Sequence, residues 1–123
     1  MDLGQPIAIE KINTYSWHLN GRAPTDRVRA TQKYLLYGSN AAVAPMVDGA
    51  ALDGRWALIG RVNTDEFFGV SRASERPPQQ AVSITASQGA IGKYRYLLWD
   101  VYPTLNHSAG DNTFYGEFDV YGK

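Results

Sequence analysis

The sequence has no cysteine, no net charge and no long apolar run, and each absence excludes a class of protein. Without cysteine there is no disulfide, no thiolate nucleophile and no cysteine metal site. The absence of cysteine does not decide the cellular compartment. Twelve basic residues balance twelve acidic ones, which argues against nucleic acid or an anionic membrane as the main partner. No apolar run approaches the roughly 20 residues that cross a bilayer, and we expect no signal peptide, because no basic-then-apolar leader opens the chain.

The sequence does contain enough apolar material for one packed core. Its 123 residues are 44% hydrophobic and 20% charged, a balance typical of a folded domain rather than a disordered chain. Single domains usually span about 100–200 residues, and no repeat, low-complexity tract or linker divides this chain. We therefore expect a single domain over residues 1–123.

Short strands are indicated by apolar residues that alternate with polar ones. Val82, Ile84 and Ala86 alternate with small hydroxyl residues, which is the period of two of a strand with one wet face. Twelve glycines and six prolines punctuate the chain between such segments. The predicted strands are residues 7–17, 33–37, 56–62, 81–87, 94–102 and 114–121.

The first of these strands carries a break in its alternation. Ile7 and Ile9 share a parity that Ile12 does not. A residue added to one strand of a pair restores the inward direction after such a break. The pattern therefore predicts a bulge or turn near Glu10 and Lys11.

Two other segments differ from simple alternation. Residues 94–102 are mostly apolar or aromatic on both faces, which is typical of a central strand covered on both sides. Residues 25–36 are the one serious helix candidate, with a possible N-cap at their start. The aromatic and aliphatic side chains of residues 34–37 favour a strand instead, so we expect at most a helical turn at 26–29.

Six short strands separated by turn signals predict an all-β fold, an antiparallel β-sandwich or jelly roll. Two sheets packed face to face bury alternate residues of each strand between them. We expect that interior to contain Leu36, Ile84, Trp99 and Phe118.

The direction of successive strands sorts the connections between them. Because neighbouring strands in such folds mostly run in opposite directions, residues 17–29, 64–80 and 104–112 should gather at one end. Residues 38–55 and 88–93 should gather at the other. The first end then collects both histidines together with aromatic and hydrogen-bonding residues: Trp17, His18, Asn20, Arg22, Asp65, Glu66, Phe67, Phe68, Arg72, Asn106, His107, Asp111 and Asn112.

This mixture of side chains suits a polyhydroxylated ligand. Aromatic faces cover the apolar C–H side of a sugar ring, while Arg, Asn, Asp and His meet its hydroxyl groups. Loops on a rigid β scaffold are also where binding residues usually lie. The alternative is that these loops are simply polar and that Trp17 or Phe67 caps the core.

Several short motifs, in this order, resemble those of galactose-binding-like domains. The motifs are DLG at 2–4, PIAI at 6–9, YSWH at 15–18, YLLYGS at 34–39, WALI at 56–59, YRYL at 94–97 and GEFDVYG at 116–122. That superfamily includes discoidin and coagulation-factor C-type domains and many bacterial carbohydrate-binding modules. The resemblance spans nearly the whole chain.

The resemblance implies a jelly-roll sandwich that binds a glycan through loops at one end and does not catalyse. An aromatic residue, a histidine and an arginine are frequent contacts in such domains. Carried onto this chain, they are Trp17, His18 and either Arg22 or Arg29, since both arginines follow the histidine. The resemblance also implies an extracellular or cell-surface location, with the domain attached to a larger secreted bacterial protein or a carbohydrate-active enzyme.

The chain departs from the family at its start. Family members carry a further strand before the DLG motif, which here begins one residue after Met1. Either the chain is an excised piece or a variant has lost that strand. A missing strand leaves a sheet edge or a face of the core exposed, so we expect a homodimer that is either domain-swapped or paired through that edge.

Catalytic and metal-binding alternatives rest on few residues. A catalytic triad of nucleophile, base and acid could be drawn from Ser16, His18 and Asp111. Their spacing in the sequence does not indicate the geometry that such a triad needs. Asp65 and Glu66 should point apart in a strand-like stretch, which disfavours a glycosidase carboxylate pair. His18, His107 and Asp111 lack a recognised metal-ligand spacing.

The segment 47–54 contains two Asp-Gly pairs. Asp48 and Asp53 are therefore candidates for a structural calcium site, although Asp-Gly is also the ordinary turn dipeptide. We expect no other cofactor. One end would be locally basic because of arginines 22, 27, 29, 72 and 76. Sulfated or acidic glycans therefore remain alternatives for the ligand.

The sequence thus favours a carbohydrate-binding module that is not an enzyme. The expected ligand-binding residues are Trp17, His18, Arg22, Arg29, Asn106, His107, Asp111 and Asn112. The alternative is a protein-protein interaction or assembly module, with Phe67 and Phe68 as an exposed hydrophobic anchor.

Overall fold

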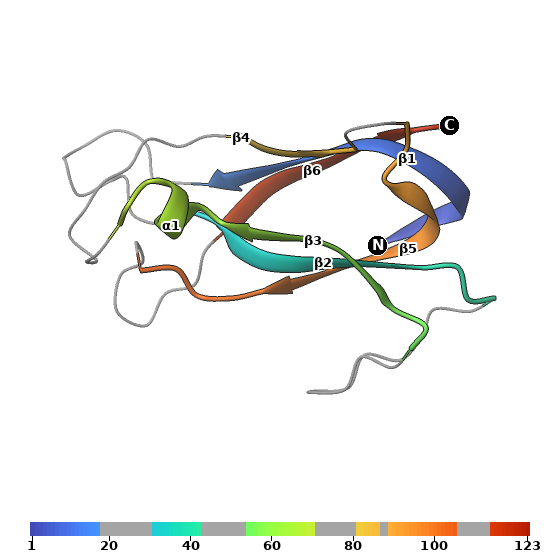
Figure 1. The fold of residues 1–123 in the computed structure, drawn as a ribbon, viewed down its shortest axis with the longest axis horizontal. Coiled ribbons are helices and arrows are strands. Elements are labelled where there is room, and N and C mark those ends of the chain that lie inside the picture. The colour runs from blue at the N-terminus through green and yellow to red at the C-terminus, as the bar shows by residue number, and fades with distance from the viewer. Residues whose placement is uncertain (18–30, 43–53, 71–80, 87–88, 106–113) are drawn as a thin grey trace.

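The computed structural model describes residues 1–17, 31–42, 54–70, 81–86, 89–105 and 114–123. Figure 1 shows that these ranges form an almost entirely β structure. The elements are β1 (Asp2–Trp17), β2 (Lys33–Ser39), β3 (Ala57–Asn63), α1 (Thr64–Phe67), β4 (Ala81–Thr85), β5 (Gly92–Val101) and β6 (Phe114–Gly122). Within those ranges, no helix is both long and apolar enough to span a membrane.

All six predicted strands are confirmed, and all their pairings are antiparallel, so the all-β prediction is confirmed too. Residues 33–36 lie in β2, which decides against a helix there because their alternating side chains are buried in the sheet. The predicted helical turn at 26–29 lies outside the described residues.

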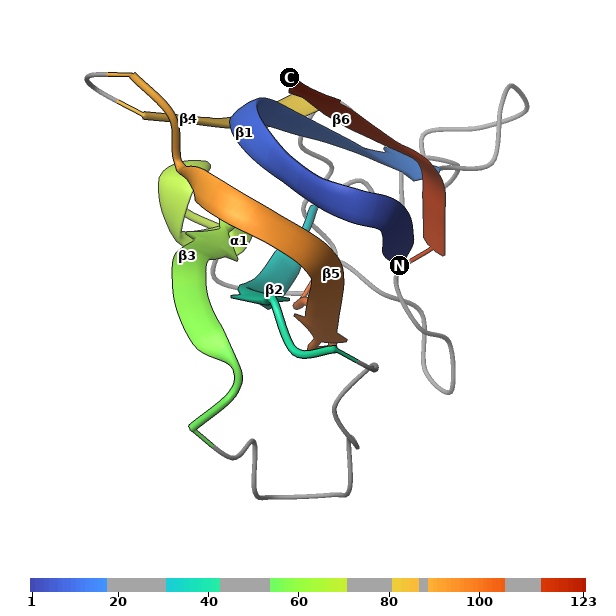
Figure 2. The ribbon, with the colours of Figure 1, turned by 90° about the vertical axis from the view of Figure 1, so that its right-hand side faces the viewer.

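The strands form one curled sheet in the order β3-β2-β5-β1-β4, with β6 also paired to β1. The long strand β1 pairs with β5 through its first half, and its second half lies between β4 and β6. Figures 1 and 2 show that the sheet bends along β1, so that β4 and β6 face β2 and β3. The two facing layers therefore share β1.

The bend in β1 contains the predicted bulge. Ile9 lies opposite Gly122 and Lys11 lies opposite Tyr121, so Glu10 is an extra residue on β1. Ile9 and Ile12 are both 0% exposed. The bulge is thus confirmed, and it turns two isoleucines of different parity into the same interior.

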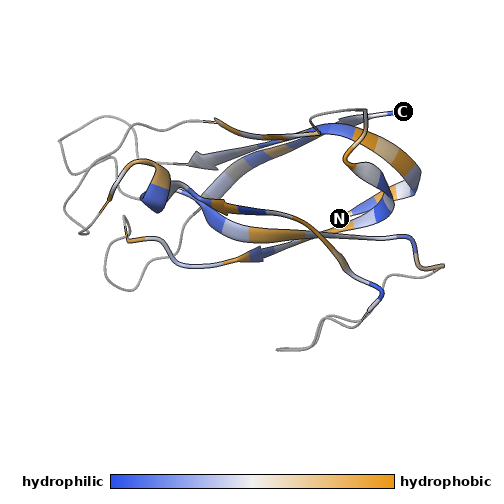
Figure 3. Ribbon diagram, in the orientation of Figure 1, coloured by the Kyte–Doolittle hydropathy of each residue, from blue (hydrophilic) through white to orange (hydrophobic). Residues whose placement is uncertain are grey.

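The core lies between the facing layers. Its fully buried members are Ile9, Ile12, Tyr34, Leu36 and Leu97. Figure 3 shows apolar and polar residues interspersed along the strands, as expected where each strand has one buried face. The apolar interior is therefore built from alternate positions of several strands.

The four predicted interior residues lie at different depths. Leu36 is fully buried, whereas Trp99 and Ile84 are partly buried and pack against the core. Phe118 is also partly buried, with its ring centroid 4.6 Å from that of Trp99. Strand β5 is central in the sheet as predicted, but adjacent residues are both buried only at Tyr96 and Leu97.

The strand directions place six strand ends together, at what we call the loop pole. The register pairs Lys33 with Asn63, Tyr34 with Val101, Tyr15 with Ala81 and Trp17 with Phe114. The described residues that flank connections 18–30, 71–80 and 106–113 therefore converge at one end, at the left in Figure 1. The predicted sorting is confirmed for these flanking residues.

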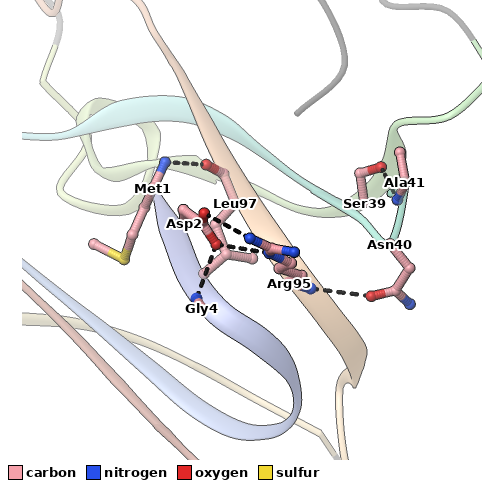
Figure 4. A network of polar contacts seen from close by, with 8 residues as sticks. All are labelled: Met1, Asp2, Gly4, Ser39, Asn40, Ala41, Arg95 and Leu97. Atoms are coloured by element: carbon pink, nitrogen blue, oxygen red, sulfur yellow. Dashed lines mark hydrogen bonds and ion pairs between the residues drawn. The ribbon is translucent and has the colours of Figure 1, made fainter. Parts of the chain in front are cut away.

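The opposite end, which we call the terminal pole, holds both chain termini and a network of polar contacts (Figure 4). Arg95 pairs with Asp2 through Nε–Oδ1 at 3.0 Å and Nη2–Oδ2 at 3.2 Å. The Asn40 side chain accepts the Arg95 amide at 3.0 Å and donates to the Lys93 carbonyl. The Met1 ammonium donates to the Leu97 carbonyl at 2.7 Å.

Candidate functional site

The α1 turn stands at the loop pole, directly after β3. Its N-cap is Asn63, whose Oδ1 accepts the Glu66 amide at 3.3 Å. Gly69, with φ of +65°, follows the last helical turn, a position that favours glycine. The sequence had predicted a strand-like stretch at Asp65 and Glu66, and this is wrong because the Asn63 cap and Gly69 bound a helical turn.

Beneath the loop pole lies a buried polar network between β1, β2 and α1. Thr14 Oγ1 donates to Gln32 Oε1 at 2.6 Å and therefore accepts from the Tyr34 hydroxyl at 3.0 Å. Gln32 Nε2 donates to the Thr14 carbonyl at 3.1 Å, and Gln32 N donates to Thr64 Oγ1 at 2.7 Å. Paired polar groups in a low-dielectric interior hold their partners in one arrangement.

Asp65 connects α1 to the segment that follows β5. It is 6% exposed, and its Oδ2 accepts the Leu105 amide at 2.7 Å. Its Oδ1 is also buried, and it has no hydrogen-bond partner among the described residues. Asp65 thus fixes the point from which residues 106–113 depart, while its neighbour Glu66 is exposed.

The tyrosines around the network stay protonated. Burial raises the pKa of Tyr34. Burial also raises the pKa of Tyr115, whose ring lies 6.0 Å from that of Tyr34 in an edge-to-face arrangement. Both phenols therefore act as neutral structural groups.

A first hollow, of about 410 Å³, lies between the end of β3, α1 and the start of β4; we call it the β3–β4 hollow. Phe67 and Phe68 line one side, with ring centroids 5.1 Å apart and nearly perpendicular planes. Phe67 is 77% exposed. Arg61, Asn63 and Ser83 also line this hollow, which therefore combines two aromatic rings with hydrogen-bonding groups.

A second hollow, of about 430 Å³, lies over the ends of β2 and β3; we call it the β2–β3 hollow. Tyr102 lines it and is 39% exposed; its hydroxyl donates to Asp100 Oδ2 at 2.8 Å, which raises its pKa. The other lining residues with exposed polar side chains are Lys33, Arg61, Asn63 and Glu66. Arg61 and Asn63 thus border both hollows.

The predicted site residues mostly lie outside the described part of the chain. Trp17 is the last residue of β1, where its backbone pairs with Phe114 at the loop pole. Outside the described residues are His18, Arg22, Arg29, Asn106, His107, Asp111 and Asn112, as well as the calcium candidates Asp48 and Asp53. The binding roles of these residues stay predictions, and the described ranges contain no group of three or more His, Cys, Asp or Glu that would hold a metal.

The sequence did not single out Lys33, Arg61, Asn63 or Tyr102. A signal for part of this set was present, because Arg61 and Asn63 share a parity in β3 and so share a face. Their proximity to Lys33 depends on the register between β2 and β3, which the residue pattern does not give.

The fold places the chain among all-β proteins built from antiparallel strands. No family model, no curated protein and no solved structure matches it.

Proposed function

We propose that this chain is a non-catalytic carbohydrate-binding module that recognises a glycan at the loop pole. The observation that carries the proposal is the pair of hollows on either side of Arg61 and Asn63, each with an aromatic wall. The motif resemblance supports the same function and adds the finer fold, a galactose-binding-like jelly-roll sandwich. It also supports an extracellular or cell-surface location.

The chemistry of the two hollows fits sugar recognition. Phe67 and Tyr102 are exposed rings that can cover the C–H face of a pyranose. Arg61 and Asn63 supply several donors and an amide oxygen to pairs of hydroxyl groups. One ligand in contact with both sides of β3 would place one sugar unit in each hollow.

The buried network beneath the pole supports this role by positioning the walls. Thr14, Gln32 and Thr64 tie the entry of β2 to the start of α1, and Asp65 ties α1 to Leu105. The described residues that flank 18–30, 71–80 and 106–113 lie at this pole. We propose that the predicted Trp17, His18, His107 and one of Arg22 or Arg29 complete the site from there.

Binding rather than catalysis fits the shape of the site. Both hollows are open at the surface, whereas catalytic sites favour deep clefts that exclude water. A shallow glycan site gains little apolar burial and competes with water for each hydroxyl group, so its affinity should be modest. We propose no cofactor for the interaction; calcium at Asp48 and Asp53 would be structural.

The test is affinity electrophoresis and glycan-array binding with single variants. Phe67→Ala, Tyr102→Ala, Trp17→Ala and His18→Ala should each weaken retention, since each removes a wall or a contact of the proposed site. Tyr121→Ala is the matched control, because Tyr121 is an exposed aromatic residue near the terminal pole. If all four variants bind glycans as the unaltered chain does, or if no glycan is bound, the proposal is wrong.

The exposure of Phe67 favours a second candidate, a protein-protein interaction or assembly module. A 77% exposed phenylalanine beside a second ring is the kind of anchor found at protein interfaces. Phe67→Ala would then abolish partner capture by the chain, and Trp17→Ala and His18→Ala would leave glycan binding unchanged or absent.

We also propose a homodimer through an open sheet edge. Among the described strands, β3, β4 and β6 each pair on one side only. Unpaired strand edges favour association with another strand. Sedimentation equilibrium should give twice the monomer mass, and a monomer at all concentrations would contradict the proposal.

A further inference from the structure

Four side chains form a square on the outer face of β2 and β3, at the loop pole. The register places Lys33 opposite Asn63 and Leu35 opposite Arg61. Opposed residues of an antiparallel pair project to the same face, and diagonal neighbours are about 7–8 Å apart. Lys33 and Arg61 are such a diagonal pair, so their two positive charges flank one small area of the β2–β3 hollow.

The charged groups in and beside this hollow lie at different positions. Lys33, Arg61 and Glu66 line it, and none of the three forms an ion pair in the part of the chain that the structure describes. Asp100 lies across β2 from Arg61, and its Oδ2 accepts the Tyr102 hydroxyl. Two cations and one carboxylate line the hollow, and Asp100 brings a second carboxylate beside it, so the positive charge is concentrated in the area between Lys33 and Arg61.

The rest of the hollow is suited to the body of a sugar. Leu35, one corner of the square, is half-buried, and the Tyr102 ring is partly exposed beside it. Asn63 offers an amide to hydroxyl groups. The volume of about 430 Å³ lies within the roughly 300–1,000 Å³ range of small-ligand sites.

We infer that the β2–β3 hollow binds an anionic sugar unit, whose carboxylate or sulfate lies between Lys33 and Arg61. The inference rests on the proposed carbohydrate function and specifies its ligand class. The Arg61 guanidinium holds the anion with two parallel donors, and the Lys33 ammonium adds a point charge. The Tyr102 ring and Leu35 take the apolar face of the same sugar. Glu66, at the edge of the hollow, opposes binding.

The experiment uses matched polysaccharides in affinity electrophoresis at low salt. Polygalacturonate is compared with its methyl ester, and dextran sulfate with dextran, so that carboxylate and sulfate are tested separately. We expect the unaltered chain to be retarded more by one acidic polymer than by its neutral partner. Retardation should fall as salt rises, because the charges involved are exposed to solvent.

Three charge variants give effects of opposite sign. Lys33→Gln and Arg61→Gln should each weaken binding of the acidic polymer by up to about fivefold, as for exposed ion pairs. Glu66→Gln should strengthen it. Lys93→Gln is the control, because Lys93 is an exposed cation on β5 near the terminal pole and should leave binding unchanged.

The outcomes separate this inference from the proposed function. Equal binding of acidic and neutral polymers, with no effect of Lys33→Gln or Arg61→Gln, overturns the anionic-sugar site and leaves carbohydrate binding standing. Equal losses in Lys33→Gln and Lys93→Gln also overturn it, because binding would then be diffuse attraction to a polyanion. Failure to bind any glycan overturns both proposals.

Discussion

The two poles of the molecule are held by polar contacts of opposite kinds. At the loop pole, Thr14 and Gln32 are fully buried and satisfy one another inside the sheet. At the terminal pole, Asp2, Arg95 and Asn40 make comparable contacts in solvent. A buried polar group that loses its partner cannot turn to water, whereas an exposed one can. Stability should therefore depend strongly on the polar groups of the loop pole and weakly on those of the terminal pole.

The largest effect is expected from Thr14→Val, which removes one hydroxyl and with it the hydrogen bonds to Gln32 Oε1 and to the Tyr34 hydroxyl. The free energy of unfolding should fall by about 2–3 kcal/mol, because two buried hydrogen bonds are lost. Urea denaturation measures this. The same change at Thr85, an exposed residue of β4, is the control and should be nearly neutral. Equal effects at the two threonines would remove the contrast between buried and exposed groups.

A smaller effect is expected from Asp65→Ala, which removes the acceptor of the Leu105 amide. The free energy of unfolding should fall by about 1–2 kcal/mol, since the lost bond involves a carboxylate. The release of a buried, unpaired Oδ1 offsets part of that loss. Glu66→Ala, at the exposed neighbouring position, should change the urea midpoint little. A midpoint unaffected by Asp65→Ala would show that α1 is anchored by other contacts.

The smallest effect is expected at the terminal pole and depends on pH. The hydrogen bond from Arg95 holds the pKa of Asp2 below its ordinary value of 3.8, and the Gly4 amide adds to this. A lowered pKa in the folded state means that the pair stabilises above that ordinary value and ceases to do so as pH falls through the lowered one. NMR titration of the Asp2 carboxyl should show the lowered pKa, and Arg95→Gln should move it upward. An Asp2 pKa unchanged by Arg95→Gln would show that the pair does not persist in solution.

Much of the fold could be predicted from local pattern alone. The alternation in residues 81–87 and 114–121 and the parity break at Glu10 depend on neighbouring residues, and the structure has β4, β6 and the bulge there. The rule that successive strands run in opposite directions predicted which strand ends meet at the loop pole. It was wrong for the first half of β1, which runs antiparallel to β5 because β1 bends back on itself. The exception was α1. The sequence pattern predicted a strand-like stretch there, but the Asn63 cap and Gly69 bound a short helical turn.

The candidate site was harder to predict because it depends on register. Thr14 and Ser16 share the parity of the buried Ile12, so their burial was present in the sequence pattern. Their partners were not, because Gln32 meets Thr14 only through the curl of the sheet. Likewise, Lys33 and Arg61 adjoin only when β2 and β3 pair in one register.

The sharing of β1 among three strands has a consequence for how the chain folds. Ile9 pairs with Gly92 and Gly122, and Trp17 pairs with Phe114, so the hydrogen bonds of β1 join segments that lie far apart in the sequence. Contacts between such distant segments form only after long loops have closed. The entropy lost in closing these loops slows folding. During synthesis, β1 pairs with β6 only after all the other described strands have emerged from the ribosome. The domain should therefore assemble cooperatively and only after β6 has been made.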